Sequence, residues 1–183
     1  MADAAGEQYP WYSVVSGPGL EQGDILLECP VFLIPPDAIR QPGDHAITVD
    51  RQNVIVMTQS CDLEIHDNGS CNANDVILAA VFFKQELTEN KTFGNKSGWN
   101  RAKKGHFPSY HVLNRCMIEN HESDFMLVDL RRVYSLSIDT VRQVAEEQGD
   151  RIRLMPPYRE HISQAFARFF MRVGLPVDIP DFK

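Results

Sequence analysis

The stretch that most constrains the fold is residues 53–62, which read Asn-Val-Ile-Val-Met-Thr-Gln-Ser-Cys-Asp. After the asparagine come four consecutive apolar residues, three of them β-branched, and then polar ones. A short apolar run between polar neighbours is typical of a strand that is buried on both faces. The polar residues at its end, among them Cys61 and Asp62, would then lie at one rim of the core. We therefore expect the other apolar runs to be neighbours of this strand.

Further strands are predicted where apolar runs are bounded by turn residues. Pro30 limits the first of them to a sheet edge or a bulge, because proline cannot donate a ladder hydrogen bond. Residues 131–132 fit a bulge between two strand segments, and residues 50–53 fit a hairpin connection into the central strand. The predicted strands cover residues 24–34, 46–49, 75–83, 110–113, 125–130 and 133–136.

Two helices are predicted near the end of the chain. Ser137 and Asp139 are both good N-caps for a short helix over residues 140–148, which a glycine follows. A second helix begins at Pro157, a residue that suits a first helical turn, and runs to Val173. Its apolar residues recur at helical spacing and form one stripe of Ile162, Phe166, Phe169, Phe170 and Val173.

These elements predict a mainly β, α+β fold. A sheet this small cannot cover its own apolar face, so it should curl into a small barrel closed by the C-terminal amphipathic helix. The 183 residues suffice for one domain, expected over residues 23–174, with an arm at 1–22 and a tail at 175–183. The pair Trp11 and Tyr12 indicates that the arm docks on this domain.

Several features bear on where the protein resides. No apolar run approaches the roughly 18 residues that a membrane-spanning helix needs, so no membrane association is expected. The N-terminus lacks the basic and apolar regions of a signal peptide. The four cysteines are widely spread, unlike those of a secreted disulfide scaffold. We therefore expect a cytoplasmic protein.

Charge is distributed unevenly along the chain. The formal net charge is −7, which argues against unspecific attraction of nucleic acid by the whole molecule. Residues 90–118, however, contain six Lys and Arg and no Asp or Glu. The part at 84–106 shows little periodicity and is predicted as a long loop. Its basic and aromatic residues predict binding of single-stranded RNA or DNA, while a solvated loop or an acidic protein partner fits the same pattern. The candidate residues are Lys96, Trp99, Arg101, Lys103, Lys104 and His106.

The order of these elements, together with four short motifs, resembles the MazF/PemK toxin family of SH3-like barrels. Gly-Asp-Ile at residues 23–25 matches the first strand of the family, and Gln-Asn-Val-Ile-Val-Met at 52–57 takes the place of its Arg-Pro strand. Asp-Val-Ile-Leu-Ala-Ala at 75–80 matches the strand after the next loop. Residues 124–133 match the Asp-to-Arg strand before the terminal helices. The correspondence covers residues 23–173.

The resemblance implies a homodimeric module of a bacterial toxin–antitoxin or defence system that engages RNA or a protein partner such as an antitoxin. Family members are metal-independent endoribonucleases that use an Arg and a Thr or Ser. This chain has Gln52 at the Arg position, beside Arg51, and Asp75 at the hydroxyl position, so the ribonuclease chemistry is expected to be altered or lost. In an active alternative, Arg51 or Arg101 stabilises the phosphate, and Asp75 or His106 acts as the base.

A third alternative comes from Cys61 and Asp62. A cysteine at a strand end can be the nucleophile of a hydrolase if a base activates it, and a half-buried structural thiol fits equally well. Cysteines and histidines at x4 spacing also fit a zinc-stabilised scaffold, although C-x-x-C pairs are absent. We expect no metal and no cofactor. The residues of the zinc alternative are Cys61, His66, Cys71, Cys116 and His121.

Overall fold

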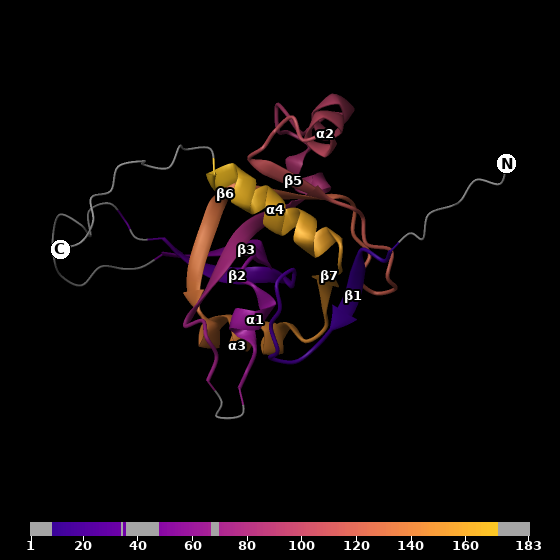
Figure 1. Cartoon of the computed structure of the whole chain (residues 1–183). Helices are drawn as coiled ribbons and strands as arrows, with labels where there is room; N and C mark the ends of the chain where they lie inside the picture. The colour runs from indigo at the N-terminus through magenta and orange to yellow at the C-terminus, as the bar shows by residue number, and fades with distance from the viewer. Residues whose placement is uncertain (1–8, 34, 36–47, 67–69, 172–183) are drawn as a thin grey trace, which may run out of the picture.

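The computed structural model describes residues 9–33, 35, 48–66 and 70–171 (Figure 1). Its centre is an antiparallel sheet of five strands in the order β2-β3-β4-β6-β5, and a second sheet pairs β1 with β7. The strands are β1 (Tyr12–Val15), β2 (Ile25–Leu33), β3 (Thr48–Val56), β4 (Asp75–Phe83), β5 (Tyr110–Leu113), β6 (Met126–Ser137) and β7 (Arg151–Leu154).

Helices lie on both faces of the central sheet. In Figure 1, α4 lies in front of the sheet, α2 stands beside β5, and α3 lies at the end opposite α2. Among the described residues, no helix is long and apolar enough to cross a membrane. The helices are α1 (Ser60–Leu63), the 3₁₀ helix η2 (Lys84–Leu87), α2 (Lys96–Lys103), α3 (Ile138–Gln148) and α4 (Tyr158–Phe170).

The last three residues of β3, Val54–Val56, are buried on both faces of the sheet, as the apolar run predicts. Ile55 belongs to the core between the sheet and α4, to which Ile162 contributes. Its neighbours Val54 and Val56 belong to a second core, on the α3 side, together with Val141. Successive residues of a strand point to opposite faces, so one run of apolar residues supplies both cores.

Most strand predictions are confirmed, and one connection needs correction. β6 is one strand whose register shifts where Val133 and Asp129 pair with consecutive residues of β4, which is the predicted bulge. β2 is an edge strand with an irregularity before Pro30, again as predicted. Residues 50–53 are not a hairpin connection, because they lie within β3, where Gln52 pairs with Cys29.

The predicted closed barrel is wrong. Among the described residues the sheet does not close, because β2 and β5 lie at opposite ends of the strand order and do not pair. The apolar faces are covered by helices instead: Val141 and Ala145 of α3 pack on one face and Ile162 of α4 on the other. A sheet covered on both faces has no need to curl. The fold is thus mixed α+β around a five-stranded antiparallel sheet.

Both helices predicted at the end of the chain are present. α3 begins after Ser137, whose side chain accepts a hydrogen bond from the backbone N–H of Thr140, and it ends at Gly149 with φ of +75°. α4 presents Ile162, fully buried, while Phe170 at the far end of the predicted stripe is exposed. Val173, the tail at 175–183, most of the predicted loop at 35–44 and part of the one at 64–74 lie outside the described residues.

The segment before β2 is tied to β7 by buried ion pairs, which sequence patterns did not predict. Asp24 is fully buried and accepts hydrogen bonds from Nε of Arg151 (3.0 Å) and from Nη2 of Arg153 (2.9 Å). Arg151 is also fully buried and donates to the carbonyl oxygens of Gly17 (2.8 Å) and Gly19 (2.5 Å). The carboxylate and the carbonyl groups together satisfy a guanidinium that has lost all contact with water.

Gly23 completes this connection through its backbone. It has φ of +94°, and a Cβ at this position would lie 3.0 Å from Cβ of Leu154. Its carbonyl oxygen accepts a hydrogen bond from the N–H of Leu154 (2.9 Å). The Gly-Asp pair at residues 23–24 therefore has a structural role, because it holds the first part of the chain against β7.

The predicted docking of the N-terminal arm is confirmed for its described part. Tyr12 is buried, and its hydroxyl donates to the carbonyl oxygen of Asn114 (2.6 Å). The carbonyl oxygen of Trp11 accepts a hydrogen bond from the N–H of Met155 (2.8 Å). These contacts place Trp11 beside the first turn of α4.

Candidate functional site

The basic segment that the sequence predicts as a long loop is folded instead. Asn90 accepts hydrogen bonds through Oδ1 from the N–H groups of Thr92 and Phe93, and Asn95 caps α2 by accepting from the N–H of Gly98 (3.0 Å). A Cβ on Gly98 would lie 1.6 Å from the carbonyl oxygen of Thr92, so this helix packs directly on the preceding turn. The prediction failed because two asparagines and a glycine, rather than an apolar period, specify this structure.

A small apolar core fixes this basic segment on the sheet. Phe93 and Ala102 are buried together with Leu127 of β6, and the rings of Phe107 and Tyr110 meet the ring of Phe93 edge to face. The cations of α2 therefore project from a rigid support, and not from a solvated loop.

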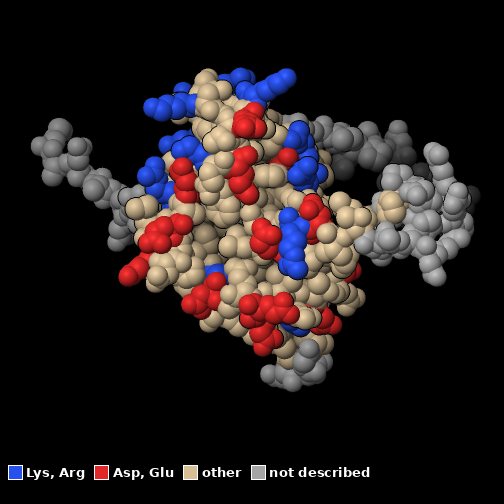
Figure 2. Space-filling model, turned by 180° about the vertical axis from the view of Figure 1, so that it is seen from behind, with Lys and Arg blue, Asp and Glu red and all other residues tan. Residues whose placement is uncertain are grey.

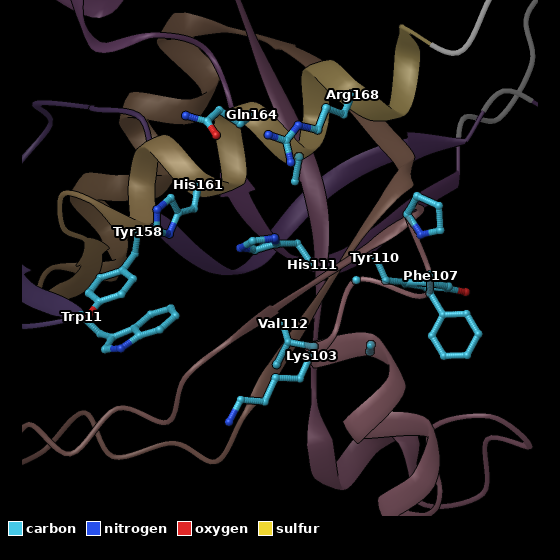
Figure 3. Close-up of a pocket in the computed structure, with 14 residues that line it drawn as sticks. Trp11, Lys103, Phe107, Tyr110, His111, Val112, Tyr158, His161, Gln164 and Arg168 are labelled. Carbon is cyan, nitrogen blue, oxygen red and sulfur yellow. The ribbon is translucent and has the colours of Figure 1, made fainter.

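A hollow of about 480 Å³ lies between this segment and α4 (Figure 3). In Figure 3 the ring of His111 lies in the middle of the hollow, with Trp11 and Tyr158 at one end and Phe107 at the other. Three parts of the chain, each distant in sequence from the next, form its wall. The lining residues are Trp11, Ala102, Lys103, Gly105, Phe107, Pro108, Tyr110, His111, Val112, Tyr158, His161, Gln164, Ala165 and Arg168.

The aromatic end of the hollow is a preformed stack. The rings of Trp11 and Tyr158 lie parallel, with centroids 3.7 Å apart and planes inclined by 10°. The ring of His161 meets Tyr158 edge to face at 6.1 Å. Because backbone contacts at residues 11–12 hold Trp11 in place, the stack presents a fixed flat surface of the kind on which a planar ligand can stack.

Two histidines from different elements face the hollow. His111 comes from β5 and His161 from α4, and both side chains are drawn in Figure 3. Burial, reinforced by the proximity of His161, lowers the pKa of His111 to about 4. His111 is therefore neutral at pH 7, and one of its ring nitrogens is free to accept a hydrogen bond.

Cations border the hollow, and no carboxylate is among its lining residues. Lys103 of α2 and Arg168 of α4 approach it from opposite sides (Figure 3), and the guanidinium of Arg101 stacks on the ring of Phe107 at 4.7 Å. In contrast, two other hollows of the described surface contain acidic residues, Glu122 in one and Glu64 in the other. In a chain with a net charge of −7, this hollow is selectively positive.

The charge distribution over the whole surface agrees with this. Figure 2 shows Lys and Arg side chains gathered at the end of the molecule that carries α2, and mostly Asp and Glu at the opposite end. An anionic ligand would therefore be attracted towards the α2 end before it makes specific contacts.

The structure brings most of the predicted nucleic-acid-binding residues together on or beside α2. Lys103 lines the hollow, Arg101 stacks on its Phe107, and Lys104 and His106 are exposed next to them. The remaining two, Lys96 and Trp99, line a different hollow at the other end of the helix.

The residues predicted from the family resemblance lie elsewhere. Asp75 is exposed at the start of β4, paired with Ser137, at the end of the strand far from α2. Arg51 is exposed on β3 and donates to the carbonyl oxygen of Glu28 (3.0 Å), while Gln52 donates to Asp50 (2.7 Å). β4 spans roughly 26 Å at about 3.3 Å per residue, and Asp75 lies at its far end, so Asp75 does not combine with Arg101 or His106 into one site. Arg51 and Gln52 lie towards the other end of β4, because Val54 pairs with Ala80, so they do not combine with Asp75 either.

Cys61 and Asp62 lie in the short helix α1. Cys61 is exposed and lines a hollow that also contains Glu21, Glu64 and Arg153. In the part of the chain that the structure describes, no group of three or more His, Cys, Asp or Glu could hold a metal ion, so the zinc alternative gains no support. His66, one of the residues of the zinc alternative, lies within hydrogen-bond distance of Asn72 instead, with 3.2 Å between Nε2 of His66 and Oδ1 of Asn72.

Sequence reasoning missed the residues that form most of the hollow. Trp11, His111, Tyr158, His161 and Arg168 were not predicted as a group, because they are far apart in the sequence and fit ordinary strand and helix patterns. A weak signal existed in α4. Tyr158, His161, Gln164 and Arg168 recur at helical spacing and form a polar face beside the phenylalanine stripe.

No family model matches the chain, and a search of curated proteins found no match either. The resemblance to MazF/PemK toxins therefore stays a prediction from four short motifs.

Proposed function

We propose that the protein binds single-stranded RNA in the hollow between α2 and α4. One observation carries this proposal: the Trp11–Tyr158 stack, Lys103 and Arg168 lie together in one hollow. No carboxylate is among the residues that line it. Aromatic platforms bind unpaired bases by stacking, and cations alongside them bind the phosphates. A duplex could not bring an unpaired base to these rings.

Binding would be strongest for a strand whose base stacks at the Trp11 end while its phosphates approach the cations. Four cations border this path, namely Arg101, Lys103, Lys104 and Arg168. If each neutralises one phosphate, the logarithm of the binding constant should fall with the logarithm of salt concentration at a slope of about −3.

The test is fluorescence anisotropy of a labelled, unstructured RNA over a range of salt concentrations. Reversal of charge in Lys103→Glu or Arg168→Glu should weaken binding about tenfold or more and flatten the salt dependence. Lys91→Glu is the matched control, because Lys91 is exposed and does not line the hollow. Equal losses in all three variants would show attraction by total charge alone and contradict the proposal. Equal affinity for DNA of the same sequence would contradict the choice of RNA.

A second candidate function, cleavage of the bound RNA, is favoured by the two histidines. Neutral His111 would accept the proton of a ribose 2′-hydroxyl, whose oxygen forms a bond to the adjacent phosphorus. The bond from phosphorus to the 5′-oxygen breaks, and His161, as the general acid, donates a proton to the leaving oxygen. The products are a 2′,3′-cyclic phosphate and a 5′-hydroxyl. This sequence of steps needs no further reactant.

Cleavage is tested separately from binding. An oligonucleotide with a single ribose in a deoxyribose strand, incubated with EDTA, should be cut only at that ribose. His111→Gln and His161→Gln should each abolish cutting while binding persists. Cutting that survives in both variants would exclude this assignment, and an intact strand with the wild-type protein would leave binding alone.

We propose a bacterial toxin–antitoxin or defence system as the setting, with a homodimer as the working unit and an antitoxin peptide that competes with RNA for the hollow. The order of the four motifs supports this setting, and so does a cationic hollow that an acidic peptide would fit. A solution mass of twice 20.8 kDa is expected for the purified chain. A mass of one chain at micromolar concentration would contradict the homodimer.

A further inference from the structure

The other end of α2 carries a second hollow, of about 390 Å³. Its floor is aromatic: Trp99 lies between Phe93 and Phe125, with ring centroids 6.1 Å and 6.4 Å away. The indole N–H of Trp99 donates to the carbonyl oxygen of Phe93 (2.6 Å), so the ring is held in one orientation. Trp99 is half-buried and therefore keeps part of its surface accessible.

The charge of this hollow matches that of the first. Lys84 and Lys96 are among its lining residues and no carboxylate is. Lys84 is already paired with Asp124 (2.9 Å), whereas Lys96 is exposed at the first turn of α2. The guanidinium of Arg115 lies over the ring of Phe125 at 4.9 Å and adds a further positive charge.

One face of α2 connects the two hollows. Lys96, Asn100 and Lys103 are spaced by four and three residues and therefore lie on the same side of the helix. Lys96 and Asn100 line the second hollow, and Lys103 lines the first. Seven residues at 1.5 Å each separate the two lysines by about 10 Å along the axis.

We propose that the second hollow binds another base of the same RNA strand, so that the strand runs along α2 from Trp99 to Trp11. This inference rests on the proposed function of the first hollow. The strand places unpaired bases on the aromatic floor at each end, and its intervening phosphates contact Lys96, Asn100 and Lys103. The chain contains two tryptophans, and each lies in one of the two hollows.

Photo-crosslinking of the unmodified protein tests this directly. A strand with 4-thiouridine at every position is irradiated, and the crosslinked peptides are identified by mass spectrometry. Long oligonucleotides should crosslink both to residues of the second hollow, around Trp99, and to those of the first, around Trp11 and Tyr158. Crosslinks at the first hollow alone would overturn this inference and leave the proposed function intact. Crosslinks at neither would overturn both.

A length series with one substitution gives a second, independent readout. Lys96→Gln should lower the affinity for a dinucleotide, which can occupy either hollow, by less than about twofold. It should lower the affinity for a long oligonucleotide, which spans both hollows, roughly fivefold, since one phosphate contact is lost. Lys91→Gln, which removes the same charge from an exposed position outside both hollows, should change neither. Equal effects of the two substitutions at every length would overturn the inference.

Discussion

Removing the carboxylate of Asp24 should destabilise the protein more than any other single loss of charge in its ion-pair network. The side chains of Asp24 and Arg151 are both 0% exposed, and Arg153, at 13%, shares the same carboxylate. Asp24→Ala leaves the guanidinium of Arg151 buried with only the carbonyl oxygens of Gly17 and Gly19 as partners. Breaking a buried pair in this way costs about 3–5 kcal/mol.

That cost is a large share of the 5–15 kcal/mol that typically stabilises a domain. Urea denaturation followed by circular dichroism at pH 7 measures it. Glu21→Gln is the matched control, because Glu21 pairs with Arg153 and Arg159 in the same network but is 41% exposed. Exposed pairs contribute about 1 kcal/mol or less.

Replacing both partners shows how much of the lost stability comes from leaving the guanidinium of Arg151 buried without its carboxylate, and how much from the loss of the ion pair itself. Asp24→Leu combined with Arg151→Met should be markedly more stable than Asp24→Ala, because the fully buried guanidinium of Arg151 is removed with its carboxylate and Arg153 keeps Glu21 as a partner. If Asp24→Ala cost no more than Glu21→Gln, the reasoning from burial would be refuted.

Three further predictions follow from the site and its support. The pKa of His111 is about 4 in the folded protein and near its ordinary 6.5 when unfolded. Protonation of His111 therefore favours the unfolded chain, so the free energy of unfolding should be highest above pH 6.5 and should fall by up to about 3 kcal/mol as the pH drops through 4. His111→Gln should flatten this decline in urea titrations at several pH values, and an unchanged decline would contradict the assignment. Gly98→Ala should cost about 3 kcal/mol and weaken RNA binding, because its Cβ would lie 1.6 Å from the carbonyl oxygen of Thr92. Ser97→Ala, at an exposed neighbouring position, should do neither, and equal thermal stability of the two variants would refute the packing argument. Iodoacetamide should label exposed Cys61 first and Cys29 last, because burial raises the pKa of the Cys29 thiol to about 11. Peptide mapping of the native protein checks the order, and early labelling of Cys29 would contradict its burial.

The sequence predicts the central sheet well because its signals are local. The apolar runs that became β4 and β5 have the predicted bounds, and α3 has its predicted cap at Ser137. β7 was missed because its sequence Arg-Ile-Arg-Leu places two arginines in a strand, and only the distant Asp24 makes their burial favourable. β1 was missed for the related reason that its partner lies about 140 residues away.

The candidate site was predicted only in its cationic part. Lys103 and Arg101 could be identified because a run without acidic residues is visible in one stretch of sequence. The histidines and the ring stack could not, because the sheet register and the β1–β7 pairing bring them together. The predicted positions Asp75 and Cys61 are local features of other parts of the surface.

The stack of Trp11 on Tyr158 has a consequence for the protein during its synthesis. Trp11 is synthesised early, whereas α4, which completes the wall of the hollow, is synthesised nearly 150 residues later. Until β7 and α4 have left the ribosome, Trp11 and β1 have no partner to fold against. A nascent chain therefore lacks the complete hollow until α4, the last helix among the described residues, has been made and can pack against Trp11.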